Sequence, residues 1–414
     1  MTPAHLTLII LILTNACIAI NCKSKSQLNK AYEGFSKNFY DKITKNKRNI
    51  GNGKFGMVYE IDWPIKDQNE QNKTKWLTKN CVIKGPNIQN DQVEDLETYV
   101  KLQEMNELLK WEIDFFQKLP EEARLNFPEF IDCYYDRDVN YYFVMEKFDF
   151  SLDEFVKVVK ENKQSQATKA KFSDLPVGAK FLYLKSMMEN VLAIHKQGRL
   201  HNDIKPENFV GMTNDIKTRL IDFGLASFID DLGSGTPCYY HPLKLQYHWY
   251  RHVSHNEEKM LNLKNQILKN DQRRFDVWSL GLTFIILVDP DLLDLIKKTP
   301  TDAEDIKKRL NPLFDKINSE EWIKDNKLDL CTSKVPFFKV CLKDIILEMV
   351  NKKEQNVKGD LEALLKKMDD IYKQNSNVIE SGRVKYEHFD LFQSLEKILT
   401  QGKGSRYEYL IPLI

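Results

Sequence analysis

The chain has 414 residues, of which 42% are hydrophobic and 29% are charged, a composition typical of globular proteins rather than disordered or fibrous ones. Its formal net charge is +1, so no overall basic field favours nucleic acid, and no nucleic-acid partner is predicted. The length allows a large core in one two-lobed domain or in two smaller domains.

Residues 1–22 have the pattern of a signal peptide. A run of mostly leucine and isoleucine at 6–13 follows a short start, and Ala16 and Ala19 are small residues suited to a cleavage site. Continued to Ile20, the apolar stretch is nearly long enough to span a bilayer, so an uncleaved anchor and a buried N-terminal segment remain alternatives. We therefore expect the secretory pathway or secretion, with membrane attachment only if the segment is uncleaved.

Three further segments follow in the sequence. Residues 23–46 are polar and rich in lysine and asparagine, which predicts an extension before the folded part. Residues 47–400 carry strand and helix patterns and are predicted to form the folded domain. Residues 401–414 are predicted to be a C-terminal tail.

The first part of this domain, 47–146, is predicted to be a small antiparallel sheet with one long helix. Short β-branched and aromatic runs, separated by turn residues, lie at 50–62, 76–84, Phe130–Tyr135 and Tyr141–Met145. Between the second and third runs, residues 91–119 have apolar side chains at helical spacing.

The second part, 149–400, is predicted to be mainly helical. Pro176–Lys196 is amphipathic, and Asp276–Val288 is almost wholly apolar, as expected for a helix through the middle of a lobe. The pattern therefore predicts an α+β protein with a small β-rich lobe and a large α-helical lobe.

A glycine-rich segment opens the first strand pair. Its glycines are Gly51, Gly53 and Gly56, and its apolar residues include Ile50, Phe55 and Val58. Glycine lets a hairpin backbone approach phosphates without a Cβ clash. The segment runs into a strand rather than a helix, which argues against a dinucleotide-binding turn. We expect these residues to bind a nucleotide.

Lys84 is a single lysine in an apolar strand-like run. Taken alone, it would be interpreted as a strand-end lysine whose amine reaches water. Beside a glycine-rich hairpin, a contact with the α- and β-phosphates is the better explanation for a charge placed in an apolar strand.

The stretch His201–Phe209 holds the residue types that phosphoryl transfer needs. Asp203 can orient a hydroxyl and accept its proton, Lys205 can neutralise a transferring phosphoryl group, and the amide oxygen of Asn208 can bind a metal ion. Asp222 follows another apolar run and supplies a second metal-binding group. This ordered series predicts phosphoryl transfer from ATP with Mg²⁺.

Together the motifs resemble those of the eukaryotic protein kinase superfamily over most of the chain. The matching segments are GxGxFGxV at 51–58, the strand residue Lys84, HxDIKPEN at 201–208, DFG at 222–224 and DVWSLG at 276–281. The Lys-Pro-Glu at 205–207 and Thr236 are similar to the serine/threonine branch. The resemblance implies a bilobal fold and transfer of the ATP γ-phosphoryl group to Ser or Thr hydroxyls of protein substrates.

The resemblance also implies roles for single residues. Lys84 should pair with a glutamate of the long helix; Glu112 has the best spacing, and Glu104 and Glu107 are alternatives. The backbone of Glu146 and Phe148, next to the gatekeeper Met145, should bind adenine, and Asp276 should hold the backbone of the catalytic loop. A stacked apolar column is expected from Phe116, Cys133, His201 and Phe223.

Two departures from the family pattern affect regulation and substrate docking. Asn202 stands where an arginine usually precedes the catalytic aspartate, so a constitutively folded activation segment, or control by another route, is expected. Leu243 stands where a glutamate usually forms a buried ion pair, which weakens the argument for peptide docking. Two alternatives therefore remain: a nucleotide-binding pseudokinase scaffold and a kinase-fold enzyme acting on a small molecule.

The seven cysteines show no paired CxxC spacing, so scattered buried thiols are expected rather than a zinc or dithiol site. In an oxidising compartment, Cys331 and Cys341 are close enough in sequence to pair.

Overall fold

The computed structural model describes residues 21–33, 36, 39–53, 56–67, 75–86, 96–136, 140–162, 171–213, 215–229, 231–296, 303–325, 342–350 and 360–387. Most of the predicted leader, Phe55, the cysteines at 331 and 341, and the predicted tail lie outside these ranges. The chain divides into two compact units, each described by itself below. The first contains the described residues through Phe148 together with Ile221–Gly224, and the second contains the others.

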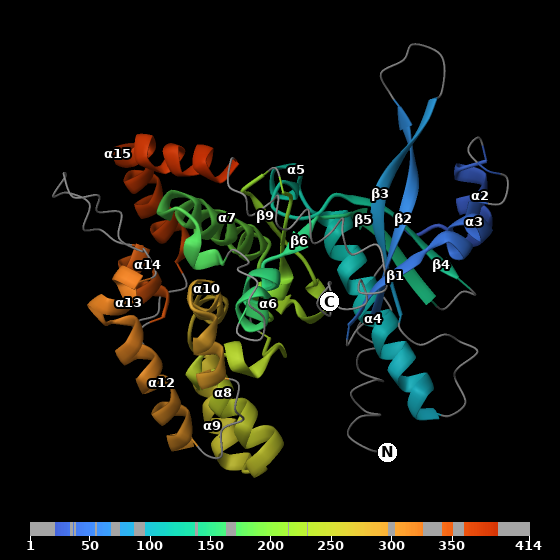
Figure 1. The fold of residues 1–414 in the computed structure, drawn as a ribbon. Helices are drawn as coiled ribbons and strands as arrows, with labels where there is room; N and C mark the ends of the chain where they lie inside the picture. The colour runs from blue at the N-terminus through green and yellow to red at the C-terminus, as the bar shows by residue number, and fades with distance from the viewer. Residues whose placement is uncertain are drawn as a thin grey trace. The chain divides into compact units, whose positions relative to one another are not determined.

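The first unit is built on a five-stranded antiparallel sheet with the order β1-β2-β3-β5-β4 (Figure 1). The strands are β1 (Arg48–Gly53), β2 (Gly56–Asp67), β3 (Lys75–Gly85), β4 (Phe130–Asp136) and β5 (Asn140–Glu146). They confirm the strands expected from the β-branched and aromatic runs. The predicted long helix is α4 (Leu96–Lys118), and a short helix, α5 (Glu121–Arg124), follows it.

Side chains alternate between the two faces of this sheet because successive residues of a strand point in opposite directions. Lys84, Phe143 and Cys133 lie side by side in the ladders of β3, β5 and β4, so they share one face. The other face carries Ile61, Trp63 and their neighbours in a buried aromatic and aliphatic cluster.

Two helices before the sheet cover that second face, α2 (Lys25–Ala31) and α3 (Phe39–Asn46). Their apolar side chains in the cluster are Leu28, Phe39, Tyr40 and Ile43. Residues 23–46, expected as a polar extension, therefore include two helices that complete the core of the first unit. Sequence reasoning did not anticipate this packing because four apolar residues among many lysines and asparagines give only a weak periodic signal.

The second unit is mainly helical. Its helices are α6 (Asp153–Asn162), α7 (Val177–Lys196), α8 (Pro242–Trp249), α9 (Glu257–Leu268), α10 (Arg273–Val288), α11 (Leu293–Ile296), α12 (Ala303–Ile317), α13 (Glu320–Asp325), α14 (Leu342–Met349) and α15 (Leu361–Glu387). Short strands form two small sheets, β6 (Phe150–Ser151) with β8 (Phe209–Gly211) and β9 (Thr218–Leu220), and β7 (Arg199–Leu200) with β10 (Ser227–Phe228). Among the residues described, no helix combines the length and apolar character required to cross a membrane.

The core of the second unit lies around α7 and α10, the two helices expected from the sequence to be amphipathic and central. Gly178 of α7 and the backbone of α15 approach closely, since a Cβ at Gly178 would lie 2.6 Å from the carbonyl oxygen of Ile379. The β-rich first unit and the helical second unit confirm the predicted α+β class.

Candidate active site

Lys84 of β3 is buried between two carboxylates in the first unit. Its Nζ lies 2.8 Å from Glu112 Oε2 and 2.7 Å from Asp222 Oδ1. Burial opposes the charge of this lysine, but the carboxylates of Asp222 and Glu112 outweigh burial and raise the pKa of Lys84 above its ordinary value. The amine therefore stays charged at neutral pH and is held at a fixed position.

The structure distinguishes between the three glutamates of α4 considered as partners of Lys84. Glu104 is exposed, and Glu107 lies 2.5 Å from Lys110 on the same helix. Glu112 is buried and forms the contact with Lys84. The helical spacing used in the sequence analysis therefore selected the residue that the structure places there.

The glycine-rich hairpin begins on β1, where Ile50 is half-buried. In its ladder Gly51 lies opposite Val58 and Gly53 lies opposite Gly56. The pairing of β1 with β2 thus brings together the described residues of the glycine-rich segment that are predicted to bind the nucleotide.

The second strand of the hairpin, β2, also pairs with β3, the strand that carries Lys84. Val58 is buried and lies directly opposite Lys84 across β2 and β3. A Cβ at Gly56 would lie 2.5 Å from the carbonyl oxygen of Gly85. A larger residue at Gly56 would therefore push β2 away from β3 at the point where the lysine is presented.

Asp222 is held against α4 by the residue that follows it. Phe223 stacks on Phe115 with ring centroids 4.4 Å apart, contacts Phe116 edge-on at 5.4 Å, and donates its N–H to Glu112 Oε1 at 3.3 Å. Asp222 has a φ of 64°, a left-handed conformation that is uncommon outside glycine. Backbone strain of this kind concentrates at functional sites, where the surroundings maintain it.

The residues predicted to contact adenine lie at the end of the sheet. Met145 is buried on β5 opposite Val82. Glu146 ends β5, and its N–H donates to the carbonyl of Glu129 at 3.0 Å. Phe148 is half-buried in the segment that follows.

Asp203 is the centre of a hydrogen-bonded group in the second unit. Its Oδ1 accepts hydrogen bonds from the N–H of Thr236 at 2.7 Å and from the Thr236 hydroxyl at 2.6 Å. Lys205 Nζ lies 2.8 Å from Asp203 Oδ2 and donates to the Thr236 hydroxyl at 3.1 Å. The carboxylate is therefore fixed in orientation, with a cation beside it.

Asn208 is oriented by the same aspartate. Its Nδ2 donates to the carbonyl oxygen of Asp203 at 2.7 Å and lies 3.3 Å from Asp203 Oδ2. Its Oδ1 is buried and accepts no hydrogen bond from any residue that the structure describes. A buried oxygen without a donor is costly. The amide therefore fits Mg²⁺, a hard cation that prefers oxygen ligands.

Asp276, at the start of α10, holds the backbone just before Asp203. Its carboxylate accepts the N–H groups of His201 at 2.7 Å and Asn202 at 2.9 Å, and it contacts His195 Nε2 at 3.0 Å. Burial opposes ionisation of Asp276, but the hydrogen bonds and charges of His195 and His201 outweigh burial and lower its pKa. The contact expected of Asp276 is present.

Asn202, which replaces the usual arginine, has a network of its own. Its Nδ2 donates to the carbonyl of Leu225 at 3.0 Å and to the hydroxyl of Ser227 at 2.9 Å. Its Oδ1 accepts a hydrogen bond from Lys244 Nζ at 2.9 Å. One amide thus links the catalytic loop, the segment after Phe223 and helix α8.

Lys244 is the functional candidate that the sequence analysis missed. It lies in the first turn of α8, is 5% exposed, and has its Nζ 4.9 Å from the ring centroid of Tyr240. Burial lowers its pKa to about 8, against the attraction of Asp276, Asp203 and Asp231. The available signal was that Lys244 directly follows Leu243, which stands where the family usually has a glutamate.

Gly233 and Gly235 of the activation segment, residues 225–241, pack directly on Asn202. A Cβ at Gly233 would lie 2.1 Å from Asn202 Nδ2, and a Cβ at Gly235 would lie 2.2 Å from the Asn202 carbonyl oxygen. These two glycines allow the close approach, because any larger residue would clash with Asn202.

His241 lies where the segment enters α8, two residues before Leu243, which stands at the position of the missing glutamate. Its ring contacts Phe275 and Trp278 with centroids 5.1 Å from each, and its Nδ1 accepts the N–H of Leu243 at 3.2 Å. Aromatic packing and a helix cap therefore anchor this point of the segment.

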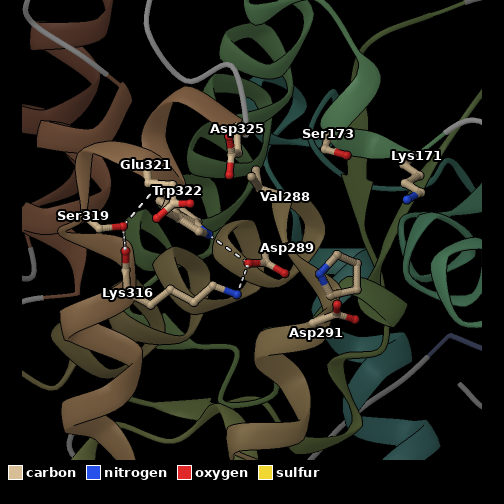
Figure 2. A pocket seen from close by; sticks show the side chains of 11 residues that line it. Lys171, Ser173, Val288, Asp289, Asp291, Lys316, Ser319, Glu321, Trp322 and Asp325 are labelled. Carbon is tan, nitrogen blue, oxygen red and sulfur yellow. Dashed lines mark hydrogen bonds and ion pairs between the residues drawn. The ribbon is translucent and has the colours of Figure 1, made fainter.

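A separate pocket of about 430 Å³ lies in the second unit (Figure 2). Asp289 lines this pocket, and its carboxylate lies 2.9 Å from both Trp322 Nε1 and Lys316 Nζ. None of the residues assigned above to phosphoryl transfer lines this pocket.

Comparisons with known proteins agree with this geometry. A family model described as the protein kinase domain matches residues 44–368. The serine/threonine-protein kinase cds1 of Schizosaccharomyces pombe is 32% identical over 149 residues, which are 34% of this chain and 29% of that protein. Calcium-dependent protein kinase 29 of Arabidopsis thaliana is 24% identical over 307 residues, 73% of this chain and 44% of that protein.

A third relative, the dual specificity protein kinase TTK of Mus musculus, is 36% identical over 107 residues, 24% of this chain and 11% of that protein. The chain spans less than half the length of each of these three relatives. The match to the family model nevertheless covers most of the chain and includes every residue of the site. The chain belongs to the protein kinase family and has its bilobal fold.

Proposed function

We propose that this chain is an ATP- and Mg²⁺-dependent serine/threonine kinase that phosphorylates proteins. The observation that carries the proposal is the fixed orientation of Asp203, whose two oxygens contact Thr236 and Lys205. A carboxylate held in this way can receive the proton of an incoming hydroxyl, and the adjacent lysine can steady the transferring group.

In the proposed reaction, the oxygen of a Ser or Thr hydroxyl forms a bond to the γ-phosphorus of ATP as the bond to the β–γ bridging oxygen breaks. Asp203 orients the hydroxyl and takes its proton, and Lys205 neutralises charge on the phosphoryl group. Lys84 and the hairpin at 51–58 position the nucleotide. Asn208 and Asp222 would hold Mg²⁺, which when bound neutralises charge on the phosphates.

The serine/threonine specificity is supported by Thr236 beside Asp203 and by the similarity to cds1 and ppk34 of Schizosaccharomyces pombe, both serine/threonine-protein kinases. The dual specificity of TTK makes tyrosine phosphorylation the alternative to test. Phosphoamino-acid analysis of the product distinguishes the two specificities.

The decisive experiment is transfer of ³²P from [γ-³²P]ATP to generic protein substrates. We expect the wild type to label Ser and Thr and Asp203→Asn to lose most of this activity, while the exposed control Asp294→Asn stays active. Equal labelling by wild type and Asp203→Asn would contradict the mechanism.

Two other results would select the alternative functions. Thermal stabilisation by ATP without turnover would favour a pseudokinase scaffold. ATP turnover with a small-molecule acceptor, and none with proteins, would favour a small-molecule kinase.

We also propose that the leader directs the protein into the secretory pathway. The apolar run at 6–13 and the small residues Ala16 and Ala19 support this location. The intact mass of the protein recovered from eukaryotic cells tests it, since cleavage after Ala16 or Ala19, which leaves Cys22 in the mature chain, shortens the chain by a defined mass. Recovery of the full-length chain would instead support the uncleaved anchor or a buried N-terminal segment.

A further inference from the structure

The segment at Asn21–Lys23 pairs with the outer edge of β4. The N–H of Lys23 donates to the carbonyl of Cys133 at 3.0 Å, and the N–H of Tyr135 donates to the carbonyl of Lys23 at 3.0 Å. The pairing is parallel, with Lys23 opposite Tyr134. Because β4 is the last strand of the sheet, the segment covers backbone groups of an otherwise open edge.

This register sets Cys22 beside Cys133. In a parallel pair, the residues before Lys23 and before Tyr134 are neighbours with side chains on the same face. Adjacent strands lie roughly 4.8 Å apart, within the roughly 4.4–6.8 Å between Cα atoms that a disulfide spans. Contact with the Cys22 thiol, together with burial, raises the pKa of Cys133 well above its ordinary value.

Helix α4 takes part in the same contact. The Asn21 N–H donates to Gln117 Oε1 at 3.1 Å, and Gln117 Nε2 donates back to the Asn21 carbonyl at 3.2 Å. Gln117 Nε2 also lies 3.4 Å from Cys133 Sγ, which in turn lies 3.3 Å from the Asn21 carbonyl oxygen. The N-terminal segment therefore connects β4 to the helix that carries Glu112.

Asp132 provides a second attachment for the segment. Its buried carboxylate forms an ion pair with Lys23 and accepts a hydrogen bond from the Tyr32 hydroxyl at 2.8 Å. The Tyr32 hydroxyl in turn accepts the indole N–H of Trp63 at 3.1 Å. These contacts on both sides of Cys22 hold it in register with Cys133.

We infer that Cys22 and Cys133 form a disulfide bond under oxidising conditions and thereby fasten the N-terminal segment across β4 and α4. With oxidised glutathione as the oxidant, Cys22, the more exposed thiol, first attacks it and releases one glutathione. The Cys133 thiolate then attacks the Cys22 sulfur and displaces the second glutathione. The two cysteines lose two electrons and two protons, and one glutathione disulfide becomes two thiols.

The other two described cysteines have different surroundings. Cys81 is buried within the cluster on the opposite face of the sheet, and Cys238 belongs to the second unit. Cys238 is half-buried and so offers a matched control for the chemistry of an accessible thiol.

The experiment uses the full-length chain treated with oxidised glutathione, alkylated in denaturant, and digested without reduction. We expect mass spectrometry to find one peptide pair joining Cys22 to Cys133, lighter than the sum of the free peptides by two hydrogens. The pair should be absent from Cys22→Ser and present in Cys238→Ser. Because the readout is a mass, it decides the proposal whether or not the chain transfers phosphate.

Thermal unfolding gives a second readout. Reduction of the oxidised wild type should lower its melting temperature by several degrees, because the bond closes a long loop, while Cys22→Ser should melt at the same temperature with and without reductant. Alkylation of both Cys22 and Cys133 in the glutathione-treated wild type would overturn the proposal. So would a bond from Cys22 to Cys17 in place of Cys133.

Discussion

Lys84 illustrates how a charge is kept inside a protein. With two carboxylates within 2.8 Å, its ammonium group is compensated, and each carboxylate depends on it in turn. Removing one partner of such a group leaves an uncompensated buried charge, so the three residues behave as a unit.

We expect Lys84→Met to abolish most ATP turnover, because the mutant lacks the cation that we propose positions the phosphates and that pairs with Glu112 and Asp222. The measurement is phosphate transfer at saturating ATP, with circular dichroism to verify the fold. Lys79→Met is the matched control, since Lys79 lies on the same strand but is partly exposed and pairs with Glu129 at the surface. Unchanged turnover in Lys84→Met would contradict the assignment.

Lys244 shows the opposite electrostatic balance. Its pKa falls from 10.5 to about 8 because burial outweighs the attraction of Asp276, Asp203 and Asp231. The neighbouring Tyr240 stays neutral in this range, because burial raises its pKa. Between pH 8 and 10.5 the unfolded chain still binds a proton that the folded protein has released, so rising pH favours folding.

We therefore expect the free energy of unfolding of the wild type to rise by about 2 kcal/mol relative to Lys244→Met between pH 8 and 10. Urea unfolding at several pH values measures this difference. Lys259→Met, an exposed lysine on α9, should show no such divergence from the wild type. If wild type and Lys244→Met unfold with parallel pH dependence, Lys244 does not titrate as assigned.

Among the secondary-structure elements, those with a strong local pattern were predictable. The β-branched runs of β2, β3 and β5 and the apolar periodicity of α4 and α10 lie within a few residues of the observed bounds. The family resemblance implied that Lys84 pairs with a glutamate of this helix, and helical spacing favoured Glu112, because residues of α4 that face the sheet recur every three or four positions.

The contacts that sequence reasoning missed join segments distant in the chain. The position of Lys244 against Asn202 depends on how the activation segment folds back, which no local periodicity encodes. The packing of α2 and α3 depends on an aromatic face assembled from several strands. Motifs predicted the chemistry of the site, whereas the contacts that support its residues arise from long-range packing.

A substitution in helix α3 tests how much the N-terminal helices contribute to the free energy of unfolding. Phe39 is 1% exposed and contacts Tyr32 and Trp63 with ring centroids 4.5 and 5.1 Å away. We expect Phe39→Ala to lower the free energy of unfolding by about 3–5 kcal/mol, since it leaves a cavity among large aromatic rings.

Urea unfolding measured by tryptophan fluorescence tests this expectation, because Trp63 lies in the same cluster. Leu125→Ala is the control: Leu125 is 74% exposed, so its loss should change stability by less than about 0.5 kcal/mol. Equal midpoints for Phe39→Ala and the wild type would mean that α3 is not part of the core.

At the scale of the molecule, the residues assigned to phosphoryl transfer are divided between the two units. Lys84, Glu112 and Asp222 belong to the first, and Asp203 and Asn208 belong to the second. Among the residues that the structure describes, Ile221–Gly224 are the ones after Phe148 that belong to the first unit. Neither unit alone contains the full set, so the proposed activity requires the whole chain.

The close approach of Gly178 to Ile379 bears on where a stable recombinant fragment of the chain should end. The family match ends at residue 368, yet Ile379 is fully buried and its backbone lies on α7. A recombinant fragment that ends at Met368 would lack the part of α15 that packs on α7. The apolar surface of α7 that this part covers would then be exposed to water. Against a fragment ending at Glu387, we expect the shorter fragment to lose at least about 2 kcal/mol in urea titrations and to precipitate more readily.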